Sequence, residues 1–149
     1  MRMRFLTWAI CLVLLMTRAS ASVLYVSLDS ANPTPPYSDW STAATNIQDA
    51  VDAATDGDQV LVTNGVYSSG MRAVHYTLGI TTNRVAVTKM LTLQSVNGPQ
   101  VTSIEGHKLP GSVTGASAFR CVYLTNNAVL VGFTLTNGAT LGYGGGIFC

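Results

Sequence analysis

Charged side chains are scarce in this sequence of 149 residues: Asp, Glu, Lys and Arg make up only 10%, and the formal net charge is +1. An average soluble protein carries roughly 25% charged residues. Lys and Arg form no run, which argues against nucleic acid as a partner, because phosphate binding needs clustered cations. The hydrophobic share of 48% excludes intrinsic disorder. With only 5 Pro beside 14 Gly, collagen-like and Pro-rich linker chains are excluded too. A β-rich protein punctuated by glycine remains.

The first 21 residues predict a secretory signal peptide. Arg2 and Arg4 precede an apolar run at 5–16, and the small residues Ala19 to Ala21 follow it as a cleavage site. The run is shorter than the roughly 20 residues that a membrane span needs, and Arg18 closes it. We therefore expect a protein that is secreted, extracellular or at the cell surface, with no membrane span after signal removal.

Residues 22–57 are predicted to form an N-terminal strand and a capping helix. A β-prone run at 23–27 precedes the proline-containing stretch 32–36. Thr45 and Gln48 then have the spacing of a capping box, which predicts the start of a helix. One apolar stripe follows at helical spacing: Ile47, Ala50, Val51 and Ala54. A helix of about ten residues is marginal alone in water, so it must lie against an apolar surface.

From Asp58 onward, short β-prone runs alternate with turn signals. The runs are at 60–62, 85–87, 91–93, 101–104, 121–124 and 129–136. This pattern fits an antiparallel sandwich or barrel, and it also fits a β-solenoid. A unit of alternating apolar residues followed by Asn-Gly recurs at 60–65, 91–98 and 131–138. Glycine permits a positive φ at a corner, so this recurrence favours the solenoid.

The stretch from Gly57 to Tyr67 (GDQVLVTNGVY), with the helix before it, resembles the opening of pectin-lyase-like proteins of the secreted bacterial type. Residues 91–95, 97–99 and 104–106 resemble their next coil, and 129–138 with 144–149 resemble the start of their repeat array. The resemblance implies an all-β fold: a right-handed single-stranded parallel β-helix (solenoid) with a short N-terminal capping α-helix. Residues 58–149 would then be the first coils, and the chain the N-terminal portion of a longer protein.

The carboxylates form no visible catalytic or calcium-binding cluster. Six of the seven acidic residues precede the repeats, and only Glu105 lies within them. Glycoside hydrolases need two carboxyl groups flanking the bond, and calcium needs several converging oxygens. His75 and His107 lack a metal-ligand spacing and are expected in loops or on the surface. We therefore assign no catalytic residue, no metal ligand and no cofactor-binding residue, and we expect no cofactor.

The remaining polar and aromatic candidates have ordinary structural explanations. We expect the scattered cations to face solvent: Arg72, Arg84, Lys89, Lys108 and Arg120. The aromatic residues either stack on sugar rings or pack in the cap and the coil corners: Trp40, Tyr37, Tyr67, Tyr76, Tyr123 and Tyr143. Outside the signal peptide the cysteines are Cys121 and Cys149, which either form a disulfide across neighbouring coils or stack as free thiols.

These observations predict a secreted or cell-surface β-helix scaffold of the adhesion type, non-catalytic as it stands. Its expected partners are extracellular polysaccharide or cell-surface components. The alternative is the N-terminal part of a pectate-lyase-like or glycoside-hydrolase enzyme whose active site lies beyond residue 149. A third reading is a small autonomous domain closed by its two cysteines. The fold alone does not choose among them, because one fold hosts many functions.

Overall fold

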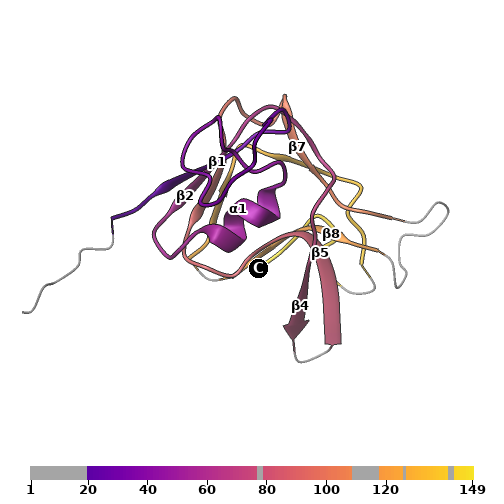
Figure 1. Ribbon diagram of the computed structural model, residues 1–149. Coiled ribbons are helices and arrows are strands. Elements are labelled where there is room, and N and C mark those ends of the chain that lie inside the picture. The colour runs from indigo at the N-terminus through magenta and orange to yellow at the C-terminus, as the bar shows by residue number, and fades with distance from the viewer. Residues whose placement is uncertain (1–19, 77–78, 109–117, 126, 141–142) are drawn as a thin grey trace, which may run out of the picture.

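The computed structural model describes residues 20–76, 79–108, 118–125, 127–140 and 143–149. All but the last two residues of the predicted signal peptide therefore lie outside the described residues. The described chain is all-β apart from one short helix, and its strands form three sheets (Figure 1). None of the helices in the described ranges is long and apolar enough to cross a membrane.

Each sheet draws its strands from distant parts of the chain. The first sheet has, in spatial order, β1 (Val23–Val26), β2 (Gln59–Val62), β6 (Thr92–Ser95) and β9 (Val129–Val131). The second sheet has β3 (Gly65–Tyr67), β7 (Thr102–Glu105) and β10 (Thr134–Thr136). The third sheet has β4 (Arg72–Tyr76), β5 (Gly79–Val87), β8 (Arg120–Leu124) and β11 (Ile147–Phe148).

After β1 and the helix, the chain passes through the first, second and third sheets in that order, three times over. Every pair of neighbouring strands is parallel except β4 and β5. The expectation of parallel strands is confirmed, and the antiparallel sandwich is wrong. Parallel pairing requires a long connection between partners, and here the other two sheets supply that connection.

Residues in register along neighbouring strands stack into apolar rows that form the core. Leu24, Val60 and Leu93 are register partners on the first sheet, and all three are buried. Tyr67 and Ile104 form the matching row on the second sheet and are also buried. Because side chains alternate along a strand, the residues before and after each of these buried residues point outward. The three inward faces therefore meet in one hydrophobic core.

Helix α1 (Ile47–Ala53) buries the predicted apolar stripe, but the predicted capping box is wrong. Asn46 is the N-cap, and its side-chain oxygen accepts from the Asp49 N–H at 3.0 Å. The Asn46 amide donates back to the Asp49 carboxylate at 2.7 Å. Asn serves as well as Thr at this position, and shifting the start by one residue frees Gln48 from a capping role.

Gln48 instead reaches across to a backbone edge of the third sheet. Its Oε1 accepts from the Ala86 N–H at 2.8 Å, and its Nε2 donates to the Ala86 carbonyl at 3.3 Å. Ala86 pairs with Tyr123 of β8 on its other side. Gln48 therefore satisfies two buried backbone groups where a neighbouring strand would otherwise be needed. Helix α1 packs against β5, β1 and β2, so the expectation that it lies against an apolar surface is confirmed.

Lys89 closes the other end of α1. Its Nζ donates to the carbonyl oxygens of Val51, Asp52 and Ala54 at 3.0, 2.7 and 2.6 Å. The last carbonyls of a helix have no partner within the helix, and a cation there also complements the helix dipole. A side chain that follows β5 thus fixes the C-terminal end of α1 against the third sheet.

The Asn-Gly repeats mark corners, but only two of the three are equivalent. Asn64 and Asn97 stack after β2 and β6, with the Asn97 amide donating to the Asn64 oxygen at 2.8 Å. The third unit, at 131–138, is not equivalent to the other two, so that part of the prediction is wrong. The strand before its Asn-Gly is β10, which pairs with β7 of the second sheet. The residues of β9 are in register with 59–61 of β2 through β6. Leu130 of β9 and Phe133 and Leu135 after the corner all pack against the core, while Val131 is exposed, so the alternation changes phase at Gly132.

The hairpin that β4 forms with the first part of β5 was not expected from the sequence, although the expected run at 85–87 is the end of β5. Its residues pair antiparallel from Arg72 with Asn83 to Tyr76 with Gly79, and the hairpin projects from the rest of the molecule (Figure 1). Arg72 also forms an ion pair with Asp52 of α1. Apolar alternation is weak here because much of the hairpin faces solvent. A strand that buries little leaves no clear period in the sequence.

Candidate binding site

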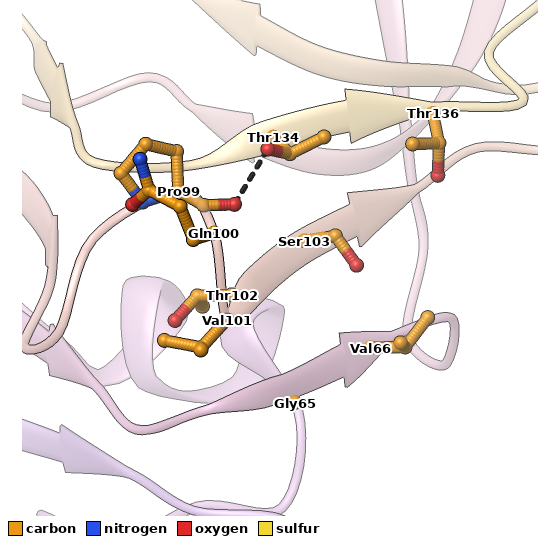
Figure 2. Close-up of a pocket in the computed structure, with 9 residues that line it drawn as sticks. All are labelled: Gly65, Val66, Pro99, Gln100, Val101, Thr102, Ser103, Thr134 and Thr136. Carbon is orange, nitrogen blue, oxygen red and sulfur yellow. Dashed lines mark hydrogen bonds between the residues drawn. The ribbon is translucent and has the colours of Figure 1, made fainter.

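A groove of about 440 Å³ runs along the outer surface of the second sheet. Outward residues of β3, β7 and β10 form its floor, and the loop 99–101 forms one wall (Figure 2). Its lining residues are small, hydroxylated, amide-bearing or apolar: Gly65, Val66, Pro99, Gln100, Val101, Thr102, Ser103, Thr134 and Thr136. None of these residues carries a charge.

Strand register positions the groove side chains. Val66, Ser103 and Thr134 are register partners on three neighbouring strands, so they form a row across the sheet. The inward neighbours Tyr67 and Ile104 are buried and hold the strands in place. Since parallel strands lie about 4.8 Å apart, the row presents polar and apolar groups at a regular spacing.

The wall of the groove is tied to its floor. The Thr134 hydroxyl donates to the Pro99 carbonyl at 2.6 Å, which joins β10 to the loop before β7 (Figure 2). Behind that loop, Ser95 donates to the Thr102 hydroxyl at 2.7 Å, and this pair is buried. A site whose side chains are already fixed loses less conformational entropy on binding.

The lining determines which ligands the groove suits. The hydroxyls of Ser103, Thr134 and Thr136 can both donate and accept hydrogen bonds, and Gln100 adds an amide. Val66 and Val101 are 56% and 45% exposed and offer apolar contact beside these polar groups. The groove lining holds no imidazole, carboxylate or ammonium for acid–base chemistry. Such a surface complements an uncharged ligand rich in hydroxyl groups.

The two histidines predicted for the surface lie apart in the fold. His75 is on the projecting hairpin and is exposed. His107 follows β7, is also exposed, and lies against the Phe119 ring at 5.4 Å between centroids. Among the residues that the structure describes, no three His, Cys, Asp or Glu side chains gather in a way that could hold a metal ion. Glu105 accepts a hydrogen bond from the Asn137 amide.

The prediction that the cations face solvent is wrong for two arginines. Arg84 is 8% exposed and Arg120 is 1% exposed. Arg84 donates to the carbonyls of Glu105 and Gly70 at 2.7 and 2.6 Å, and burial lowers the pKa of its guanidinium. Arg120 donates to the Tyr143 carbonyl at 3.1 Å and lies over the Phe148 ring. Both guanidinium groups, which come from central strands of the third sheet, bind backbone carbonyls of other segments: the end of β7 and the loops that contain Gly70 and Tyr143.

Asp58 lies between α1 and β2 and is buried, with 5% of its surface exposed. Burial by itself raises the pKa of this carboxyl, yet the opposing hydrogen bonds prevail and its pKa lies below the ordinary value. The donors are the Ser22 N–H, the Thr55 N–H and the Thr55 hydroxyl, at 2.7, 2.7 and 2.9 Å. The ionised form of Asp58 therefore stabilises the turn after α1.

Of the two alternatives for Cys121 and Cys149, the structure has free thiols. Cys121 is buried on β8, where its Sγ lies 3.1 Å from the Thr136 carbonyl, and burial raises its pKa. Cys149 is exposed. The disulfide between them stays a prediction that a mass measurement can test.

Comparisons with protein-family models, with curated proteins and with solved structures found no match to this chain.

The groove was not predicted from the sequence, although the sequence contains a signal for it. Thr134 and Thr136 flank Leu135, and Ser103 precedes Ile104, so hydroxyls alternate with core residues in two runs. Recognising that the two runs lie side by side required the register between β7 and β10.

Proposed function

We propose that the three sheets form a right-handed parallel β-helix of the pectin-lyase-like kind, with α1 as its N-terminal cap. The proposal is supported by the order in which the chain visits the sheets and by the parallel register within each of them. Right-handed connections between parallel strands are strongly favoured, because of the twist of the strands. The contacts of Gln48 with Ala86 support the capping role.

On this framework the protein is a secreted or cell-surface scaffold of the adhesion type that binds carbohydrate without transforming it. The single observation that carries this function is the uncharged, hydroxyl-lined groove on the second sheet. Its groups can exchange hydrogen bonds with sugar hydroxyls, while Val66 and Val101 contact the apolar faces of sugar rings. The predicted signal peptide would deliver the protein to the compartment where such polysaccharides occur.

Affinity electrophoresis through gels containing a neutral polysaccharide, hydroxyethylcellulose, tests this function. We expect the full chain to be retarded by the neutral polymer and to migrate freely through polygalacturonate gels. Thr134→Val removes the hydroxyl that contacts Pro99 and should weaken binding roughly three- to tenfold, the range for one hydrogen bond. Thr125→Val is the matched control, because the Thr125 hydroxyl also donates to a strand carbonyl but lies outside the groove.

Equal retardation of Thr134→Val and the unmodified chain would remove the groove from the proposal. Ser103→Tyr, which fills the groove floor, gives a second variant should the loss of one hydroxyl be too small to resolve. An absorbance increase from unsaturated product on polygalacturonate would overturn the non-catalytic function. That result would favour the alternative of a lyase.

A further inference from the structure

The outward face of the first sheet carries no charged side chain, unlike an ordinary solvent-facing sheet surface. On β1, β2, β6 and β9 the outward positions hold only apolar, aromatic, threonine or glutamine residues. Tyr25, Leu61, Gln94 and Val131 are register partners in one outward row. Val129 and Val131 are each 45% exposed, and Tyr25, Leu61 and Gln94 are half-buried. Apolar groups that stay open to solvent on a face without charge commonly mark a binding site.

Trp40 extends this row beyond β1. Its ring packs edge-on against Tyr25, with centroids 4.4 Å apart and planes inclined by 63°. The Trp40 side chain nevertheless stays 43% exposed. Tyr25 thus supports the indole from one side while leaving indole surface open to a ligand. We define the sheet-one platform as Trp40, Tyr25, Leu61, Gln94 and Val131.

The turn that carries Trp40 is rigid. The Asp39 carboxylate accepts from the Ser41 N–H, the Ser41 hydroxyl and the Thr42 N–H at 2.8, 2.6 and 3.0 Å. The hydrogen bond from the Ser41 hydroxyl, together with those from the backbone N–H groups, holds the pKa of Asp39 below its ordinary value. These bonds order the backbone on both sides of Trp40, and the Tyr25 ring contacts its indole, so less freedom is left to lose on binding.

Amide groups lie beside the apolar platform. Gln59 Nε2 donates to Gln94 Oε1 at 3.0 Å, which aligns two side-chain amides across neighbouring strands. Each amide has further donor and acceptor capacity. An aromatic plane, aliphatic side chains and amides, with no charge, match the chemistry of a neutral sugar chain: apolar C–H faces and hydroxyl edges.

We propose that the sheet-one platform is a second carbohydrate-binding site, which takes a neutral polysaccharide with a sugar ring stacked on Trp40. The ligand class rests on the proposed function, but the site lies on a different sheet from the groove and uses none of its residues. A neutral ligand is favoured because no outward residue of the first sheet can pair with a carboxylate or sulfate.

Tryptophan fluorescence tests this site directly. The sequence has 2 tryptophans, so in the full chain carrying Trp8→Phe only Trp40 emits. We expect cellohexaose or chitohexaose to change Trp40 emission saturably, and trigalacturonic acid to leave it unchanged. Calorimetry should show Trp40→Ala binding the neutral oligosaccharide roughly tenfold or more weakly, as expected for an aromatic hot spot. Tyr143→Ala is the matched control, since Tyr143 is 83% exposed and lies outside the platform.

Thermal melting of Trp40→Ala close to that of the unmodified chain would show that the variant folds. The proposal would be overturned by unchanged Trp40 emission with neutral oligosaccharides, by equal binding of these sugars to Trp40→Ala, or by equal binding of trigalacturonic acid. A shift in emission that follows protein concentration alone would show that a second copy covers the platform, and would also overturn it. If Thr134→Val loses affinity while Trp40→Ala does not, the groove proposal stands and the platform proposal fails. If only Trp40→Ala loses affinity, the platform proposal stands and the groove proposal fails.

Discussion

Gln48 provides the sharpest test of how the helix covers the sheet. The residue is 3% exposed, and its amide satisfies both the N–H and the carbonyl of Ala86, which is itself 2% exposed. Gln48→Leu keeps the size of the side chain and removes both hydrogen bonds to Ala86, together with the bond from Nε2 to the Asp52 carboxylate. Each buried backbone group left without a partner costs about 1–3 kcal/mol. The loss of amide desolvation offsets part of this cost, so we expect the free energy of unfolding to fall by about 2–4 kcal/mol.

Urea denaturation followed by circular dichroism measures this change. Gln59→Leu is the matched control, because Gln59 is also a glutamine that bonds a partner on a neighbouring strand, but it faces outward. We expect the control to lose less than about 1 kcal/mol, as for an ordinary exposed hydrogen bond. A Gln48→Leu variant within about 0.5 kcal/mol of the unmodified chain would refute the reasoning, because surface substitutions alone produce changes of that size.

Gln48→Glu adds a pH dependence with a definite sign. The new carboxylate would face the Ala86 carbonyl and Asp52, whose Oδ1 accepts from Gln48 Nε2 at 2.9 Å. Ionisation is therefore disfavoured in the folded state, and the pKa of this glutamate should be raised. Relative to the unmodified chain at the same pH, the variant should be least stable at neutral pH. It should recover as the pH falls through that raised pKa, because a protonated carboxyl can donate to Ala86. A pH-independent difference would contradict this account.

Three further predictions concern other parts of the fold. Val51→Asp should lower the free energy of unfolding by more than about 2 kcal/mol, because it places an unpaired charge under α1; a melting temperature within a degree or two of the unmodified chain would contradict this. Asp58 has a depressed pKa in the folded state, so its contribution is present at neutral pH and is lost as the pH falls below the ordinary aspartate range near 4. Asp58→Asn should therefore flatten the acid limb of a stability–pH curve, and an unchanged limb would exclude this role. In the native protein a maleimide should label exposed Cys149 quickly and buried Cys121 only after unfolding. If neither cysteine is labelled until a reductant is added, the two form a disulfide.

Local patterns in the sequence predicted much of the framework. The apolar stripe from Ile47 to Ala54 is buried, and the expected strands correspond to β1, β2, the end of β5, β6, β7 and β8, while the expected run at 129–136 is divided into β9 and β10. In β1, β2, β6 and β7 buried residues alternate with less buried ones, so their periods appear directly in the residues. The β4–β5 hairpin was missed for the opposite reason, since its outer residues bury little and leave no period.

Long-range partners were beyond the reach of local reasoning. Thr45 and Asn46 are both acceptable helix caps, and the structure has Asn46 in that position. With this cap, the Gln48 side chain bonds to Ala86, 38 residues away, instead of taking part in a capping box. Arg84 and Arg120 looked like surface cations, but carbonyls from distant loops make their burial tolerable. Each of these outcomes depends on a partner that the surrounding sequence does not reveal.

By itself, the sequence determined that the chain is rich in short strands, poor in charge and equipped with one amphipathic helix. Those properties follow from side-chain period and composition, which act over a few residues. The tertiary structure alone decided which hydroxyls share the groove and which uncharged side chains form the sheet-one platform. The reason is strand register: Ser103 and Thr134, or Tyr25 and Leu61, become neighbours only when backbone hydrogen bonds align strands from distant parts of the chain.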